Sequence, residues 1–212
     1  MSAVVLAAGQ SRRMGKINKL TAVVAGKPVI RHVVDTVLEA GFQDIVVVLG
    51  YDEQAVSACL EGLPVRFVKN EAFRSGQASS VSAGISALDN NVSDVMVVLG
   101  DMPLLNAALL NNLHHHHMRN PQHEQMISLP VCLKDRERQV GNPVIWGRQF
   151  FPDLQALTGD QGGRQIWSDH PAIINQMDVE DATLFLDTDT AEALRRAEVL
   201  LSLIHISEPT RP

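Results

Sequence analysis

The sequence predicts an α/β fold built on a single doubly wound, mostly parallel sheet. Three apolar runs, Ala3 to Gly9, Asp44 to Gly50 and Asp94 to Gly100, are rich in Val, Ile and Leu, and each ends in glycine. Because these runs do not alternate with polar residues, they are typical of strands covered on both faces. Helix-like stretches separate the runs, and this alternation favours parallel strands joined by right-handed crossovers.

Five stretches have helical signatures. Pro28 to Ala40 carries apolar residues at helical spacing between an opening proline and the closing glycine that follows it. Helices are also predicted over Gln54 to Glu61, Ser79 to Leu88 and Leu104 to Leu113. A closing helix is predicted over Thr190 to Leu201.

The pattern changes after about Gln125. MISLPVCL and NPVIWG predict two strands flanking the charged turn KDRERQVG, as a small β insertion beside the main sheet in the C-terminal half. AIINQMDV and ATLFLDT predict two further short strands. The final residues, SLIHISEPTRP, resemble a translated cloning or adaptor sequence. We therefore expect one domain over residues 1–201 and a non-native or disordered tail over 202–212.

Composition restricts the class of protein. A chain of 212 residues that is 45% hydrophobic can bury the core of one domain. Its net charge of -6 argues against nucleic-acid or membrane partners. The apolar runs fall short of the ~18 residues of a membrane span. Cys59 and Cys132 are too far apart in sequence for a CxxC pair, which favours a reducing, cytoplasmic setting.

The first segment is basic although the protein is acidic. Asp35 is the first acidic residue, and six cations precede it: Arg12, Arg13, Lys16, Lys19, Lys27 and Arg31. Such a start also occurs in targeting segments, but VVLAAG has the pattern of a buried strand. A strand followed by glycines and cations suits a phosphate ligand. The P-loop spacing is excluded, because five residues separate Gly9 from Gly15, and Gly9-Gln10-Ser11 excludes the dinucleotide motif.

The loop LAAGQSRRMGKINK closely resembles the signature of nucleotidyltransferases that condense a nucleoside triphosphate with a phosphorylated acceptor. The resemblance continues in GKPVIRHVVDTVLEAG, GQASSVSAGI, GDMPLL, GNPVIWGRQFFPDL, GDQGGR and LDTDTAEAL. The chain is most similar to the molybdenum cofactor cytidylyltransferases, which join CMP from CTP to molybdopterin. The resemblance implies a Rossmann-like nucleotidyltransferase fold, Mg²⁺ as cofactor, a molybdopterin-like acceptor, and a molybdoenzyme or its chaperone as a further partner.

The resemblance also implies roles for individual residues. Gly9 and its neighbours give amides to the triphosphate, Arg13 and Lys19 hold its charged oxygens, and Ser80 with Ser79 reads the cytosine edge. For the two serines, capping of the following helix is an equally good interpretation. Ala8 favours cytidine, because the related guanylyltransferases usually have glycine there. The catalytic set is Arg13, Lys19 and Asp101, and the nucleotide-binding set is Leu6, Ala7, Ala8, Gly9, Arg13, Lys19, Ser79, Ser80 and Asp101.

Two carboxylates are candidates for the metal. Asp101 directly follows the strand VMVVLG, at the edge where ligands bind in such sheets. A carboxylate there can hold Mg²⁺ together with substrate phosphates, or it can cap the next helix. The second metal ligand in the resemblance is Asp189, with Asp187 as the alternative.

The acceptor side departs from the family pattern. Gly141, Asn142 and Pro143 correspond to an acceptor-binding loop that usually reads Gly-His-Pro. Trp146, Phe150 and Phe151 fit either the border of an acceptor pocket or core packing. The run His114 to His117 fits either adventitious metal binding or a solvated helix end. Three functions stay open: the cytidylyltransferase, a nucleotidyltransferase with another base such as GTP or another acceptor, and a catalytically silent nucleotide- or cofactor-binding module.

Overall fold

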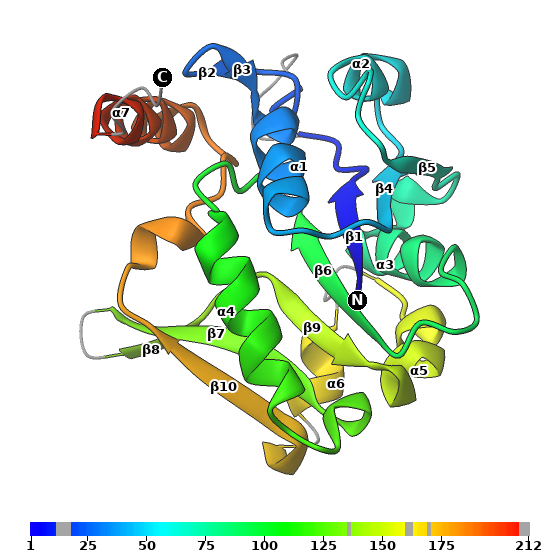
Figure 1. Cartoon of the computed structure of the whole chain (residues 1–212). Helices are drawn as coiled ribbons and strands as arrows, with labels where there is room; N and C mark the ends of the chain where they lie inside the picture. The colour runs from blue at the N-terminus through cyan, green and yellow to red at the C-terminus, as the bar shows by residue number, and fades with distance from the viewer. Residues whose placement is uncertain (12–17, 135–136, 160–162, 169–170, 208–212) are drawn as a thin grey trace.

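The structure, a computed structural model, describes residues 1–11, 18–134, 137–159, 163–168 and 171–207. One mixed sheet crosses the molecule in the order β10-β7-β9-β6-β1-β4-β5, with β8 paired to β7 (Figure 1). The strands β6, β1, β4 and β5 run parallel to one another, as predicted. The strands are β1 Ser2–Ala7, β4 Ile45–Leu49, β5 Arg66–Lys69, β6 Asp94–Leu99, β7 Ile127–Lys134, β8 Glu137–Val140, β9 Val144–Gly147 and β10 Ile174–Val179.

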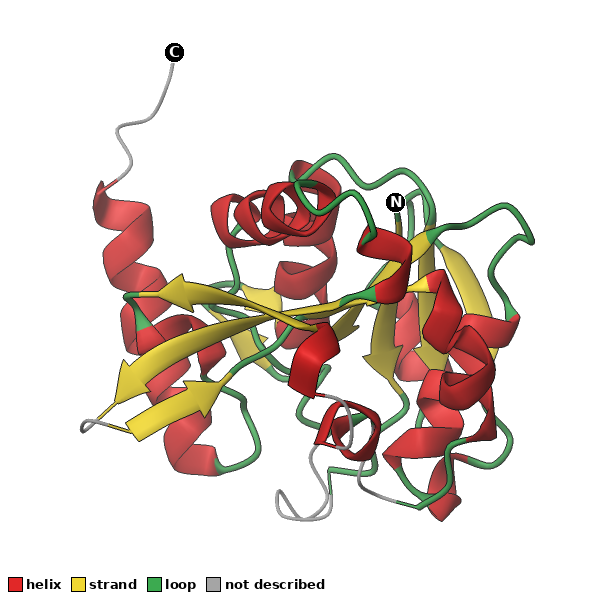
Figure 2. Ribbon diagram, turned by 90° about the horizontal axis from the view of Figure 1, so that it is seen from below, coloured by secondary structure: helices red, strands yellow, loops and turns green. Residues whose placement is uncertain are grey.

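Helices cover both faces of the sheet (Figure 2). A small antiparallel pair, β2 Val23–Val24 and β3 Lys27–Pro28, precedes the first helix. The α-helices are α1 Val29–Glu39, α2 Glu53–Ala58, α3 Gln77–Ser86, α4 Ala107–Met118, α5 Phe151–Ala156, α6 Arg164–Ser168 and α7 Ala191–Ser207. Short 3₁₀ turns are η2 Phe73–Ser75, η3 His123–Gln125, η4 Arg148–Phe150, η5 Pro171–Ile173 and η6 Ala182–Phe185.

The central strand β1 explains the continuous apolar runs. Successive side chains of a strand point to opposite faces of the sheet. Val5 packs into the core under α1 and α4, whereas Val4 packs into the core under α3 and α5, and both are fully buried. Burying one such side chain stabilises the fold by about 1.5–3 kcal/mol. A strand with two covered faces therefore needs apolar residues at every position.

The C-terminal half belongs to the same sheet. β9 pairs antiparallel with β6 and β7 pairs antiparallel with β9, so the predicted small β insertion is continuous with the main sheet. The predicted charged turn contains a strand of its own, β8, which forms a hairpin with β7. The strand predicted for AIINQMDV is confirmed as β10, which lies parallel to β7 at the sheet edge.

Two predictions for the C-terminal segment are wrong. The predicted strand ATLFLDT contains the 3₁₀ turn η6 instead, because Asp181 accepts hydrogen bonds from the Thr183 backbone (2.9 Å) and hydroxyl (2.6 Å). Such local side-chain bonds compete with strand pairing. The predicted end of the closing helix at Leu201 is also wrong, because α7 runs to Ser207; the non-native origin of residues 202–212 stays a prediction. Leu201 lies in a small apolar cluster with Val24, which anchors this helix to the body of the protein.

Within the described ranges, we find no helix with the length and apolar character that crossing a bilayer requires.

Candidate functional site

A cavity of about 450 Å³ lies where β1 and β6 end. This edge, outside the carboxyl ends of parallel strands, is where ligands bind in doubly wound sheets. Its lining residues include the predicted nucleotide-binding residues Leu6, Ala8, Gly9, Lys19, Ser80 and Asp101. Ala7 is fully buried in β1 and is not among the lining residues. Arg13, with Arg12 and Lys16, lies outside the described residues.

Backbone hydrogen bonds position Lys19, which lines this cavity. Its N–H donates to the Ser11 hydroxyl at 3.1 Å, and Ser11 has a positive φ of 50° that turns the chain sharply after β1. Asn18 accepts a hydrogen bond from the Leu20 backbone at 3.0 Å, which fixes the residues on both sides of Lys19. The buried ammonium group of Lys19 then forms ion pairs with Asp101 and Asp189.

The electrostatics of Lys19 follow from these pairs. Burial by itself lowers the pKa of the Lys19 ammonium, but the carboxylates of Asp101 and Asp189 outweigh this effect and raise it above its ordinary value. The lysine is therefore a fixed positive charge at neutral pH.

Asp101 and Asp189 meet because the LDTDT segment docks against the end of β6. Thr188 is fully buried, and both its N–H (3.0 Å) and its hydroxyl (3.1 Å) donate to the Asp101 carbonyl oxygen. Gly100, directly before Asp101, lets the end of β6 pack closely against β1. A Cβ at this position would lie 2.7 Å from the Leu6 carbonyl oxygen. Both predicted metal ligands therefore face one ammonium group.

The two carboxylate oxygens of Asp101 differ in their partners. Oδ2 bonds to Lys19, whereas Oδ1 is buried and has no hydrogen-bond partner among the described residues. The helix-capping alternative for Asp101 is wrong, since α4 begins at Ala107 and Asn106 caps it through the Leu109 N–H at 2.8 Å. A buried carboxylate oxygen without a donor is costly unless a ligand satisfies it.

Asp187 stands beside this pair, at the rim of the cavity. Partial desolvation raises the pKa of its carboxyl group, and the nearby negative charges of Asp189 and Asp101 add to that effect. Lys19 and the three aspartates leave a formal charge of -2 at the end of the sheet. A divalent cation would balance this charge.

Ser80 faces the cavity from α3. This helix begins at Gln77, so Ser79 and Ser80 lie inside its first turns, and the capping alternative is wrong for both. Asn70 donates to the Ser80 hydroxyl oxygen at 3.0 Å and to Ser79 at 2.8 Å. Ser79 donates back to the Gly76 carbonyl at 2.8 Å and is not a lining residue. Ser80 is buried and lines the cavity.

A second cavity, of about 570 Å³, adjoins the first and shares Leu6, Gln77 and Leu99 with it. Of the predicted acceptor residues, Gly141 and Asn142 line this cavity, whereas Pro143 is buried and does not. The two cavities together give room for two reactants side by side.

Aromatic side chains form one wall of the second cavity. Trp146 packs in the core and also lines the cavity, stacked on Trp167 with ring centroids 5.7 Å apart. Gly163 lies against the Trp146 ring, where a Cβ would approach to 2.2 Å. Phe150 and Phe151 belong to the core, as the packing interpretation predicted.

Several predicted cations and histidines lie away from the cavity. Lys27 and Arg31 both pair with Asp35, at 2.7 and 3.1 Å, so they do not extend the basic site. The run His114 to His117 lies at the end of α4, and of these four histidines His117 alone is fully buried.

Sequence reasoning missed three residues that position the site. They are Asn18, Asn70 and Thr188, each buried and each hydrogen-bonded to the chain beside a predicted residue. A polar residue directly after a strand was a usable signal for Asn70, which follows β5. No sequence pattern marked Thr188.

The fold and the family match together place the chain among the α/β nucleotidyltransferases. Residues 3–174 match the MobA-like NTP transferase domain, and the chain belongs to this family.

The comparisons with individual proteins cover most of the chain. Nicotine blue oxidoreductase from Paenarthrobacter nicotinovorans is 28% identical over 92% of this chain and 95% of its own length. The bifunctional protein GlmU from Symbiobacterium thermophilum is 38% identical over 98% of this chain but only 47% of its own. The chain thus spans about half the length of that relative. A nucleotidyl transferase from Methanothermobacter has the same fold, with a TM-score of 0.80 and 23% identity over 95% of this chain and 98% of its own.

Proposed function

We propose that the protein transfers CMP from CTP to the terminal phosphate of a molybdopterin-like acceptor and releases pyrophosphate, with Mg²⁺ as cofactor. The observation that carries the proposal is the convergence of Asp101 and Asp189 on the Lys19 ammonium, where one buried oxygen of Asp101 has no partner among the described residues.

The donor set fits a magnesium ion. Mg²⁺ binds through one or two carboxylates and substrate phosphates, and the open oxygen of Asp101 supports such a ligand. Asp101 and Asp189 would hold the metal, with Asp187 beside them. A bound Mg²⁺ supplies charge neutralisation and alignment of the phosphates.

Lys19 is the residue that this chain contributes to phosphate binding. Both reactants are anionic, so the site must offset their repulsion and hold the attacking oxygen in line with the α-phosphorus. Asp101 and Asp189 would hold the divalent cation, and the Lys19 ammonium beside them would bind the triphosphate oxygens. Because the acceptor phosphate is already ionised, the attack needs no protein base. Arg13, in the same loop by sequence, is proposed as the second phosphate ligand.

Base recognition rests on Ser80. The Ser80 hydroxyl, hydrogen-bonded by Asn70, can donate to an acceptor on the cytosine edge, and Ala8 lines the same cavity. Stacked Trp146 and Trp167 in the adjoining cavity suit a planar heterocycle such as a pterin. Gly141 and Asn142 stand at the same wall and are proposed to contact the acceptor.

The test measures pyrophosphate release from purified protein with Mg²⁺, molybdopterin and each of CTP, GTP, ATP and UTP. We expect release with CTP, and release only when acceptor and metal are both present. Release with GTP instead overturns the base assignment. Release with sugar phosphates but not with molybdopterin overturns the acceptor. Nucleotide binding without release in every mixture identifies a silent binding module.

A second candidate function comes from the relative that aligns over most of both chains, an oxidoreductase named for nicotine blue. The tryptophan wall would stack any planar conjugated ring, including that of a pigment. The same preparation is therefore assayed for bleaching of nicotine blue in the presence of an added electron donor, against a control without protein. Bleaching without pyrophosphate release favours the oxidoreductase.

A further inference from the structure

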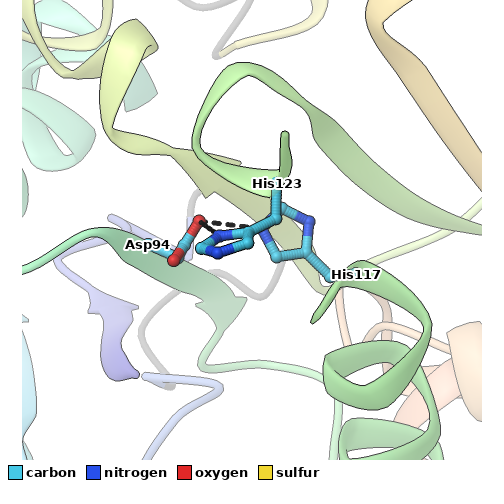
Figure 3. A group of neighbouring side chains, drawn as sticks. All are labelled: Asp94, His117 and His123. Carbon is cyan, nitrogen blue, oxygen red and sulfur yellow. Dashed lines mark hydrogen bonds and ion pairs between the residues drawn. The ribbon is translucent and has the colours of Figure 1, made fainter. Parts of the chain in front are cut away.

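A second polar cluster lies at the other end of β6. Asp94, His117 and His123 come from the first residue of β6, the last turn of α4 and the turn η3 (Figure 3). Asp94 Oδ1 lies 2.9 Å from His117 Nε2 and 3.0 Å from His123 Nδ1. One potential ligand atom from each residue falls within 4.8 Å of the other two.

This cluster is separate from the nucleotide cavity. Asp94 begins β6 and Asp101 follows its end, so at ~3.3 Å per residue the two carboxylates lie on the order of 20 Å apart. Neither of the two cavities described above is lined by a residue of the cluster. The cluster therefore needs an explanation of its own.

The atoms that face away from the centre are already held by neighbours. Ser93 donates to the other Asp94 oxygen, Oδ2, at 2.6 Å. His117 Nδ1 lies 2.7 Å from the Ser128 hydroxyl, which Asn175 fixes in turn with a 3.1 Å hydrogen bond. Because a hydroxyl can donate or accept, Ser128 satisfies either tautomer of His117. Metal-ligating histidines almost always have such a partner on their second nitrogen.

The facing atoms define the ligand set. Asp94 Oδ1, His117 Nε2 and His123 Nδ1 together make an N₂O set.

We propose that Asp94, His117 and His123 form a binding site for a divalent transition metal of the zinc type, distinct from the Mg²⁺ of the transfer reaction. Two imidazole nitrogens and one carboxylate oxygen suit Zn²⁺ or Co²⁺ and are poor ligands for Mg²⁺. His123 is 20% exposed, whereas Asp94 and His117 are buried, so the metal enters from the η3 side and a water completes the coordination there. The metal ties α4, η3 and β6 together.

The test titrates protein stripped with EDTA against Zn²⁺ and Co²⁺. We expect one equivalent of Zn²⁺ to bind and raise the Tm, and Co²⁺ to give visible d–d absorption. Asp101→Asn must keep that equivalent, because its metal is a different one. A wild-type protein that binds no Zn²⁺, or that loses its equivalent in Asp101→Asn, overturns the proposal.

A matched pair of variants separates the cluster from the exposed histidines. His123→Asn keeps a side-chain N–H for Asp94 but is a poor metal ligand, so it should weaken Zn²⁺ affinity by at least about 100-fold, the upper end of what loss of an outer-shell partner costs. His115→Asn removes an exposed histidine of the same run and should change affinity less than about twofold. The reverse result shows chelation by the surface run and overturns the proposal.

One measurement needs no variant. Imidazole ¹⁵N spectra of the wild-type protein should show Zn²⁺ shifting His117 Nε2 and His123 Nδ1 while the resonances of His115 stay in place. Shifts confined to His114, His115 and His116 contradict the assignment even if His123→Asn fails to fold.

Discussion

The two ends of β6 carry two carboxylates that differ in their hydrogen bonding. Asp94 accepts hydrogen bonds on both oxygens, from His117 and His123 on one and from Ser93 on the other. Asp101 pairs with Lys19 through one oxygen, and its buried second oxygen has no partner among the described residues. The first arrangement holds the fold together without a substrate, whereas the second is completed only when a ligand arrives.

Removing the carboxylate of Asp94, which is hydrogen-bonded on both oxygens, should have the largest effect on stability. Asp94→Ala leaves the buried imidazole of His117, the partly exposed imidazole of His123 and the Ser93 hydroxyl without their acceptor, so we expect a loss of about 3–5 kcal/mol in the free energy of unfolding. Urea denaturation in EDTA measures it. Asp35→Ala, which breaks a partly exposed pair with Lys27 and Arg31, should cost under about 1 kcal/mol. Equal losses would contradict the comparison.

Changing Asp101, the carboxylate with one unpartnered oxygen among the described residues, should affect catalysis more than stability. Asp101→Asn keeps the shape of the side chain but removes its charge, and we expect kcat for pyrophosphate release to fall by about 10²- to 10³-fold, or 3–4 kcal/mol. Its free energy of unfolding should change by about 1 kcal/mol or less, since Lys19 retains Asp189. Unchanged turnover would remove Asp101 from the metal site.

The same contrast shows what the sequence alone could predict. The strand ends that carry Gly9 and Asp101 were predictable, because short continuous Val and Ile runs ending in glycine are typical of strands buried on both faces. The resemblance then marked Lys19 and Asp189, which the structure brings to Asp101. Thr188 was not predictable, because its role is a contact with a carbonyl 87 residues earlier.

The histidine run shows the same limit. His117 differs from His114 to His116 only in its direction from the helix, which depends on where α4 begins and how it packs on β7. The helix was predicted to stop at Leu113, so the pairing of His117 with Asp94 could not be found. Similarly, local hydrogen bonds at Asp181 overrode the strand propensity of ATLFLDT.

Low pH should remove the contribution of Asp94 to the free energy of unfolding. The folded pKa of Asp94 is about 2 against an ordinary value of 3.8, so its contribution to stability is complete above pH 4 and is lost as the pH falls from about 4 toward 2. The contribution amounts to about 2 kcal/mol. Free energies of unfolding between pH 6 and pH 2 should therefore fall more steeply in the wild type than in Asp94→Asn. Parallel curves would show that Asp94 is not ionised in the fold.

The smallest predicted effect concerns Ser80 in the nucleotide cavity near Asp101. Ser80→Ala removes one hydroxyl that lines the nucleotide cavity, so we expect KM for CTP to rise by about 5- to 10-fold, or roughly 1 kcal/mol, with little change in kcat. Ser82→Ala is the matched control, because its hydroxyl lies two residues away on α3 and donates to the Gln155 carbonyl at 2.9 Å, outside the cavity. Measured with CTP and UTP, Ser80→Ala should also narrow the preference between the two bases. A preference that stays constant would place base recognition on the backbone of α3 rather than on this hydroxyl.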